Sequence, residues 1–444
     1  MSGRADEVRR AFGGPVHHVY VHVPFCRAKS DYCDFASMAV GAPGAGASAG
    51  AGGIVEADAA FDAFVDGVAA EWERERAAHD VRRLRTLYLG GGTPSLLGPE
   101  RLERLLELFR PHLTPHAEVT VEANPEDVDE AFAAWAAAAR VAGGAGAGRG
   151  LRISLGVQSF APQLRAALGR RAQADPAAAF SRLRRAGLCV LSLDLIHGIP
   201  GQTADHLEAD IAAVVGLGPG HVSWYELTPA AGTPLAARLA AGPPSAQCPA
   251  DGPGGARACD AGAAREPDAR GAAAADLAGA SAADLADAAA ARYRRIVRAL
   301  TRAGYDWYEV SNFALPGRKA RHNLAYWRAR PYLGLGPGSV STFGARRWTD
   351  LPDPAPWGAA LAAGATPPRD VEDLDDGVRA RERLLLAARC GDPVPLAEVD
   401  GVVDRRVAAQ LAAAGLVSLH SGTIRVTRKG RYVAGEVCVR LFRA

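Results

Sequence analysis

Two cysteines near the start of the sequence are the first residues whose types and spacing suggest chemistry. Cys26 and Cys33 are the closest pair among the seven cysteines of the 444-residue chain. Thiolates are soft, anionic ligands that suit iron and iron–sulfur clusters. Between them, Ser30 offers a hard hydroxyl with a high pKa, and Asp31 offers a carboxylate that would be an unusual ligand. The odd number of cysteines and their scatter argue against a disulfide framework.

A second group of candidate residues follows short apolar runs. Gly91 and Gly92, in GGGTPS, would let a ligand approach a backbone whose N–H and C=O groups can hold polar atoms. Glu122 in VEANP, Gln158 in GVQSF and Asp194 in LDLIHGIPG each lie near the end of another run. Polar side chains in buried strands need partners, so these positions favour ligand contacts.

The elements that must position these residues alternate between strand and helix. Apolar runs typical of buried parallel strands cover 17–25, 84–91, 117–125, 151–160, 189–201 and 221–229. Segments with helical spacing lie between them, as at 61–78 and 101–109. This order predicts an α/β fold, an incomplete TIM-like (β/α)6 barrel with its chemistry at the C-terminal strand ends.

Three low-complexity stretches interrupt this pattern at 41–53, 142–150 and about 237–286. They lack periodic large apolar residues, so we expect flexible loops. After about residue 370, the order helix, two short strands and helix resembles a small winged-helix module, a fold that does not by itself imply DNA binding. The predicted domains are a barrel (1–235), an insertion (236–287), a barrel-associated segment (288–345) and a C-terminal winged-helix-like α+β module (346–444).

Composition bounds the class of protein. Lys+Arg is 51 and Asp+Glu is 49, so the formal net charge is +2 and gives no reason to expect a nucleic-acid partner. Hydrophobic residues make up 48%, enough for a sizeable core. No apolar run reaches the roughly 18–20 residues that cross a bilayer, and the charged start lacks a signal-peptide pattern. We therefore expect a soluble, cytoplasmic protein without a transmembrane segment.

The segment YVHVPFCRAKSDYCDF (20–35) resembles the cluster loop of the radical S-adenosylmethionine superfamily. In that superfamily, three cysteines spaced C-x3-C-x2-C hold a [4Fe–4S] cluster, and its open iron binds S-adenosylmethionine. Cys26 and Cys33 match the first and third ligands, and Ser30 occupies the middle position. The resemblance implies a metal site that two cysteines alone should fill weakly or not at all.

The same resemblance implies an S-adenosylmethionine pocket around the GGGTPS loop, which includes Gly91. The matching positions are Tyr20, Gly92, Thr93, Glu122, Gln158, Arg170 and Asp194. A histidine commonly follows the LGR motif in relatives, and here that position is Ala172.

Within the superfamily, the chain is most similar to the heme chaperones of the HemW type. The segment 308–327 contains the H-N-x-x-Y motif from His322 to Tyr326, and this motif implies that His322 helps to hold heme. Imidazole is a good axial ligand for heme iron. A cysteine that commonly lies two residues before this motif is Ala320 here. The implied function is to bind heme and pass it to an acceptor protein.

Two alternatives stay open at this point. One is an enzyme similar to oxygen-independent coproporphyrinogen III oxidase, in which a 5′-deoxyadenosyl radical oxidises propionate side chains. Ser30 argues against it, and so does Phe35, where that enzyme has a further cysteine. The other is a degenerate module that only binds S-adenosylmethionine. The sequence assigns no catalytic residue.

Overall fold

The structure is a computed structural model that describes residues 14–40, 52–139, 151–170, 174–188, 190–241 and 282–443. The three predicted insertions lie largely outside these residues. The same is true of Ala172, which marks the missing histidine of the LGR motif.

Six parallel strands form the centre of the molecule, so the predicted six-stranded barrel is confirmed. In spatial order they are β1 (Val16–Val23), β4 (Val81–Gly91), β5 (Leu113–Ala123), β6 (Arg152–Gln158), β7 (Leu191–His197) and β8 (His221–Glu226). Three short strands that the sequence pattern did not predict extend this sheet. They are β11 (Leu333–Leu335), parallel beside β1, and the antiparallel β10 (Asn312–Ala314) and β9 (Asp306–Glu309) beyond β8.

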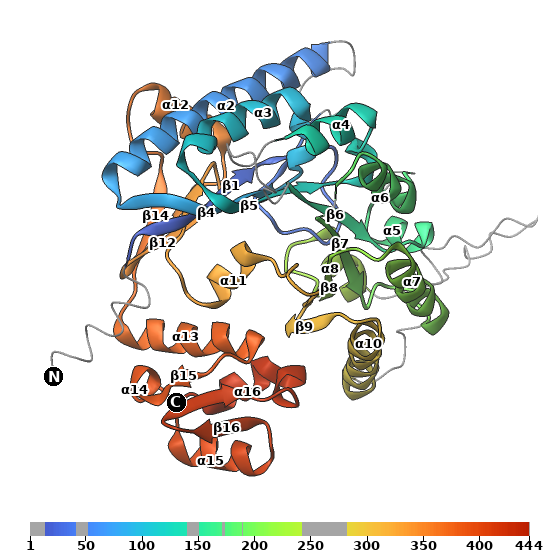
Figure 1. Cartoon of the computed structure of the whole chain (residues 1–444), viewed down its shortest axis with the longest axis vertical. Coiled ribbons are helices and arrows are strands. Elements are labelled where there is room, and N and C mark those ends of the chain that lie inside the picture. The colour runs from blue at the N-terminus through green and yellow to red at the C-terminus, as the bar shows by residue number, and fades with distance from the viewer. Residues whose placement is uncertain are drawn as a thin grey trace, which may run out of the picture.

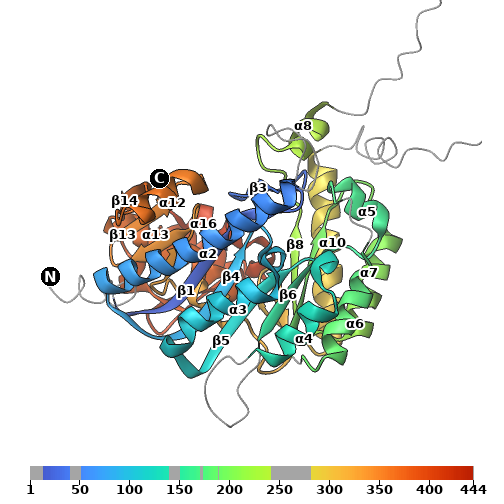
Figure 2. The ribbon, with the colours of Figure 1, turned by 90° about the horizontal axis from the view of Figure 1, so that it is seen from above.

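Helices cover the outer face of the strands (Figures 1 and 2). They are α2 (Gly52–Ala78), α3 (Gly98–Phe109), α4 (Glu130–Ala138), α5 (Pro162–Ala167), α6 (Pro176–Arg185), α7 (Ala204–Leu217) and α10 (Ala282–Arg302). The short helix α8 (Pro234–Ala241) lies instead beside the end of α5 and the segment that contains Asp31. The starts of the covering helices follow ordinary capping chemistry. Asp129 caps α4 by accepting from the Phe132 N–H, and Thr203 forms a capping box with His206 at α7. Single 3-10 turns lie at Pro94–Leu97, Arg110–His112, Pro125–Asp127 and Gly430–Val433.

Side chains alternate between the two faces of each strand and make the barrel interior polar. Leu87, Val121 and Leu193 belong to the apolar core outside the strands. Their neighbours Tyr88 and Glu122 line a cavity inside the barrel, together with other even-numbered residues. Because successive strand residues point to opposite faces, this division follows from the strand period of two.

A small antiparallel sheet follows the barrel and packs beside α2. It consists of β12 (Val340–Phe343), β13 (Arg346–Asp350) and β14 (Arg369–Asp373), with α12 (Pro354–Ala362) between the last two. Trp348 and Trp357 from this unit belong to the hydrophobic core of the barrel. The domain boundary predicted at residue 346 therefore falls between two strands of one sheet.

The C-terminal residues form a module with its own core. Its elements are α13 (Asp376–Cys390), β15 (Val394–Pro395), α14 (Leu396–Val399), α15 (Arg405–Ala413), β16 (Val417–His420), β17 (Thr423–Val426) and α16 (Ala434–Leu441). Leu384, Leu411 and Ile424 lie in that core, apart from the barrel core. Figure 1 shows the module below the barrel, with α13 facing α11 (Arg321–Trp327).

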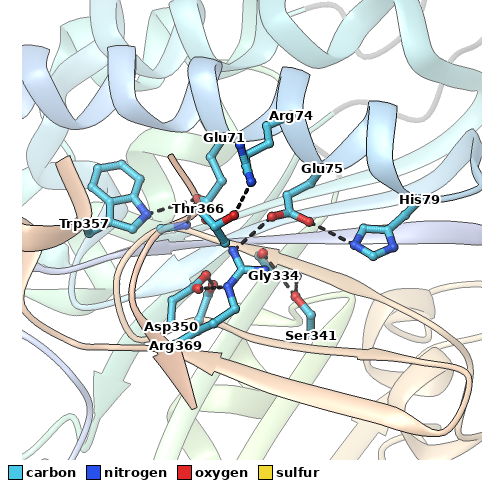
Figure 3. Close-up of polar contacts among 12 residues, drawn as sticks. Glu71, Arg74, Glu75, His79, Gly334, Ser341, Asp350, Trp357, Thr366 and Arg369 are labelled. Atoms are coloured by element: carbon cyan, nitrogen blue, oxygen red, sulfur yellow. Dashed lines mark hydrogen bonds and ion pairs between the residues drawn. The ribbon is translucent and has the colours of Figure 1, made fainter. Parts of the chain in front are cut away.

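A buried group of acids joins α2 to the small sheet (Figure 3). Glu71 accepts hydrogen bonds from the Gly336 N–H at 2.7 Å and from Trp357 Nε1 at 3.2 Å. The Arg369 guanidinium lies 2.9 Å from both Glu75 and Asp350. Burial, with Asp350 nearby, raises the pKa of Glu71 well above its usual range. Burial therefore favours the neutral form of the Glu71 carboxyl.

Within the described residues, no helix combines the length and the apolar character needed to cross a membrane.

Candidate functional site

A cavity of about 490 Å³ opens at the C-terminal ends of the barrel strands. The loop after β1, the glycine loop after β4 and the ends of β5, β6 and β7 all contribute to its walls. Most of the residues that the sequence singled out line it: Cys26, Ser30, Cys33, Gly91, Gly92, Thr93, Glu122, Gln158, Arg170 and Asp194. Tyr20 and His322 are not among the lining residues.

The cysteine loop is closed at its base by two very short strands. Cys26 ends β2 (Phe25–Cys26), which pairs with β3 (Met38–Ala39). The Thr93 hydroxyl donates to Cys26 Sγ at 3.7 Å. Burial is the main cause that raises the pKa of the Cys33 thiol, so this thiol stays protonated unless a cation binds beside it.

The donor set around this loop contains two thiols and no third strong ligand. Asp31, the sequence neighbour of Ser30, instead forms an ion pair with Arg238 of α8. Among the residues that the structure describes, no group of three His, Cys, Asp or Glu side chains could hold a metal ion. The loop therefore does not provide the three soft ligands that a [4Fe–4S] cluster takes from this motif.

The glycine loop brings bare backbone to the cavity wall. Gly91 has φ +109°, a conformation that other residues rarely adopt. The Gly92 N–H donates to the Val23 carbonyl at 2.7 Å, and a Cβ on Gly92 would lie 2.5 Å from the Phe25 carbonyl oxygen. No side chain fits at these two positions, because a Cβ would meet His22 or the main chain of Val23 and Phe25.

Glu122 is the central carboxylate of the site. Tyr88 donates its hydroxyl proton to Glu122 Oε1 at 2.6 Å, and the Gly91 N–H donates to Oε2 at 3.2 Å. Burial, with Asp194 nearby, raises the pKa of Glu122 to about 7 despite these hydrogen bonds. The group can therefore change its charge near neutral pH when a cationic ligand arrives.

Asp194 and Gln158 face the same space from neighbouring strands. The Ser154 hydroxyl donates to Asp194 Oδ2 at 2.8 Å, and burial raises the pKa of Asp194. Gln158 has φ +64°, and the register between β6 and β7 shifts between Gly156 and Gln158. A left-handed conformation at a non-glycine residue costs energy and is common at binding sites.

Two arginines leave buried nitrogen atoms without protein partners. Arg170 Nη1 donates to Asn124 Oδ1 at 2.6 Å, but its Nε has no partner. Arg152, which is only 4% exposed, lines the cavity while its Nε and Nη1 lack partners. An anionic ligand group would satisfy them, since unpaired buried donors are costly.

Sequence reasoning missed Arg152, Tyr88 and Asn124. The signal that could have found them is the alternation of polar and apolar residues along β4, β5 and β6, because it marks a polar barrel interior.

The comparisons with known proteins agree with this geometry. Residues 20–214 match the model of the Radical SAM superfamily. The heme chaperone HemW of Mycobacterium tuberculosis is 35% identical over 94% of this chain and 93% of its own length. The chain belongs to the HemW family. HemW of Escherichia coli is 31% identical over 73% of this chain and 70% of its own length.

A solved structure outside the HemW family shares the fold. Coproporphyrinogen III oxidase (HemN) from Escherichia coli, a radical SAM enzyme, matches with a TM-score of 0.67 and 19% sequence identity. The match covers 99% of this chain and 93% of that one. The likeness extends through the C-terminal module and concerns the fold alone.

The two residues that resemble HemW positions but do not line the cavity have other surroundings. Tyr20 donates its hydroxyl proton to, or accepts one from, His22 Nδ1 at 3.0 Å. His322 is 1% exposed, with its Nδ1 2.7 Å from Thr86 Oγ1 and its Nε2 2.8 Å from the Tyr326 hydroxyl. Both imidazole nitrogens of His322 are therefore engaged, and heme ligation by this side chain stays a prediction that requires one hydrogen bond to break.

Proposed function

We propose that this protein binds heme and transfers it to an acceptor protein in the cytoplasm. The observation that carries this proposal is the 35% identity to a heme chaperone over 94% of the chain. Heme is then cargo, and the barrel cavity is a separate site that binds S-adenosylmethionine.

The lining of the barrel cavity fits S-adenosylmethionine. Arg152 and Arg170 offer unpartnered nitrogen atoms for its carboxylate. Glu122 would accept from its ammonium group, and Asp194 from hydroxyl groups of its ribose. When bound, this molecule is a sulfonium whose positive charge the two carboxylates stabilise.

The lining does not fit a standard [4Fe–4S] cluster, because Ser30 stands between the two thiols of the loop. We assign no step to a cluster. This mismatch supports a chaperone in preference to an oxidase that would require radical chemistry.

Hemin titration followed by absorbance tests the binding half of the proposal. We expect saturable binding with about one hemin per chain and a shifted Soret band. Mixing the loaded protein with apomyoglobin then tests release, since a chaperone should give up its hemin to a stronger acceptor. Absence of saturable binding, or hemin that never leaves the protein, would contradict the proposal.

The oxidase alternative has its own readout. After anaerobic reconstitution with iron and sulfide, we expect no cleavage of S-adenosylmethionine by the wild-type chain. Formation of 5′-deoxyadenosine would favour the enzyme instead.

A further inference from the structure

A second cavity, of about 600 Å³, lies beside the N-terminal half of β1 and is separate from the first in its lining. Strands β1 and β4 form one side of it, and α11 forms the other. Its titratable lining consists of His17, His18, Arg85, Arg321, Arg328 and Arg330. The functional site described above uses none of these residues.

The charge of this cavity favours an anionic ligand. Arg328 pairs with Asp392 at 2.9 Å, and Arg321 Nε lies 3.8 Å from Glu118. Arg85 and Arg330 are exposed, and neither has a carboxylate partner in the part of the chain that the structure describes. A cavity with unneutralised guanidinium groups attracts carboxylates or phosphates, which Arg can bind through two parallel hydrogen bonds.

The backbone holds one of these arginines in place at some conformational cost. Ala329 has φ +52°, a left-handed conformation at a non-glycine residue, directly before Arg330. The Arg330 N–H donates to the Ala325 carbonyl at 2.9 Å and closes the C-terminus of α11. Such local cost is often retained where a side chain must point at a ligand.

The remaining walls of the cavity are apolar. Pro15, Leu324, Ala325 and Pro331 lie among the charged residues. An inorganic phosphate would make no favourable contact with these apolar residues. A flat apolar molecule that carries carboxylates would contact both the apolar residues and the arginines. Heme, with its porphyrin ring and two propionates, has this chemistry.

A histidine in this cavity is oriented as metal-binding histidines usually are. His18 Nδ1 lies 2.9 Å from Thr86 Oγ1, and the same hydroxyl lies 2.7 Å from His322 Nδ1. Within the described residues, His18 Nε2 has no hydrogen-bond partner. Burial and the neighbouring His17 and arginines lower the pKa of His18 to about 4, so its imidazole is neutral at neutral pH. A neutral ring anchored through Nδ1 leaves Nε2 free to bind iron.

Resting on the function proposed above, we infer that heme binds in this second cavity, with His18 Nε2 as the axial ligand of its iron and Arg85 and Arg330 on its propionates. The H-N-x-x-Y histidine is then a positioning residue. His322 orients the Thr86 hydroxyl, Thr86 orients His18, and Tyr326 holds the far side of His322 at 2.8 Å. This arrangement assigns iron ligation to a residue outside the motif.

Hemin titration of single variants tests the ligand assignment. His18→Ala should lose the imidazole-ligated Soret and EPR signature and bind hemin at least about tenfold more weakly. In His18→Gly, added imidazole should restore the signature. His420→Ala, at an exposed position of β16 in the C-terminal module, is the matched control and should titrate like the wild type. Circular dichroism of each variant confirms folding.

The propionate contacts have an independent probe. Arg85→Ala and Arg330→Ala should each weaken hemin binding several-fold, while binding of hemin dimethyl ester, which lacks the carboxylates, should be weak and unchanged by these substitutions. Equal effects on both molecules would overturn the propionate assignment.

The positioning role of the motif is tested through its link to His18. Thr86→Val removes the shared hydroxyl at nearly constant volume. It should shift the ligand-field bands of bound hemin while binding persists, an effect that loss of stability alone would not produce.

The outcomes separate this inference from the proposed function. Wild-type ligation that survives in His18→Ala, or that disappears in His17→Ala or His322→Ala but not in His18→Ala, overturns the inference and leaves the heme chaperone function standing. A wild-type protein that binds no hemin overturns both.

Discussion

At the residue scale, the cysteine loop shows how one atom limits a site. Cys26 and Cys33 line the barrel cavity with Ser30 between them, and Asp31 is engaged by Arg238. The loop thus lacks the third sulfur that the motif requires. The polar residues predicted for the pocket beside it, such as Glu122 and Asp194, do line the cavity. Binding of S-adenosylmethionine and assembly of a cluster should therefore be separable in this protein.

Ser30→Cys should restore cluster assembly. With three thiolates, anaerobic reconstitution should give roughly four iron ions per chain and a broad absorption near 400 nm, whereas the wild type should hold little iron. Iron analysis after gel filtration measures the difference. Ser37→Cys is the matched control, since it adds a thiol to the same loop outside the motif. Equal iron contents in the two variants would contradict the prediction.

Glu122 should make S-adenosylmethionine binding depend on pH. Its pKa of about 7 means that the apo carboxyl is mostly protonated at pH 6, whereas the cationic ligand favours the carboxylate. Affinity should therefore rise about eightfold from pH 6 to pH 7.5, in step with the ionised fraction of the apo carboxyl. Calorimetric titrations at both values measure it.

The matched variant is Glu122→Gln, which should bind weakly and without this pH dependence. A persisting pH dependence would assign the titration to Asp194, whose pKa burial also raises.

At the element scale, the strands were predictable because each is a short run rich in apolar residues between segments with helical spacing. The predicted run at 84–91 corresponds to β4, and that at 221–229 to β8. The strand predicted over 151–160 is longer than β6, which ends at Gln158, because Gln158 leaves the extended conformation. The three-residue strands β10 and β11 carry too few residues for any period to appear.

The site residues were predictable only in part for a similar reason. Sequence identifies the polar residues at strand ends, and the cavity collects most of them. The environment of His322 could not be predicted, because its partner Thr86 lies 236 residues away in sequence. Such contacts depend on the folded barrel rather than on any local pattern.

The junction between α2 and the small sheet should weaken as pH rises. In the folded state, burial raises the pKa of Glu71, and burial raises the pKa of Asp350 to about 6. A raised carboxyl pKa gives stability that is fully present below the unfolded value, near 4, and is lost as pH rises through the folded value.

Glu71→Gln keeps the acceptor for Gly336 and cannot ionise. The Tm of this variant minus that of the wild type should therefore increase as pH rises from 5 to 8. Thermal denaturation followed by circular dichroism measures this difference. Glu73→Gln, on an exposed face of the same helix, should show no such trend, and a constant offset in Glu71→Gln would contradict the prediction.

At the scale of the whole molecule, arginines of the C-terminal module attach it to the edge of the barrel sheet. Arg431 lies 4.1 Å above the Trp307 ring and donates to the Trp307 carbonyl at 2.9 Å. Arg389 pairs with the fully buried Glu309 at 2.6 Å. The module therefore rests on β9, a strand that the barrel itself leaves at the edge.

Arg431→Ala should weaken this attachment. Loss of the cation–π contact and the hydrogen bond should cost about 1–2 kcal/mol of unfolding free energy. Urea denaturation measures it, and Arg440→Ala, on an exposed position of α16, serves as the control. A loss that is equal in the two variants would show that the contact contributes nothing specific.

The helix α11 separates the two cavities and contributes residues to the lining of both. Ala320 and Asn323 belong to the wall of the barrel cavity, and Arg321 and Leu324 to the wall of the basic cavity. A ligand that moves α11 when it binds in one cavity must alter the affinity of the other cavity for its own ligand. By thermodynamic reciprocity, each ligand changes the affinity for the other by the same factor. A nucleoside bound at the mouth of the barrel would thus change the affinity for a tetrapyrrole that it does not contact.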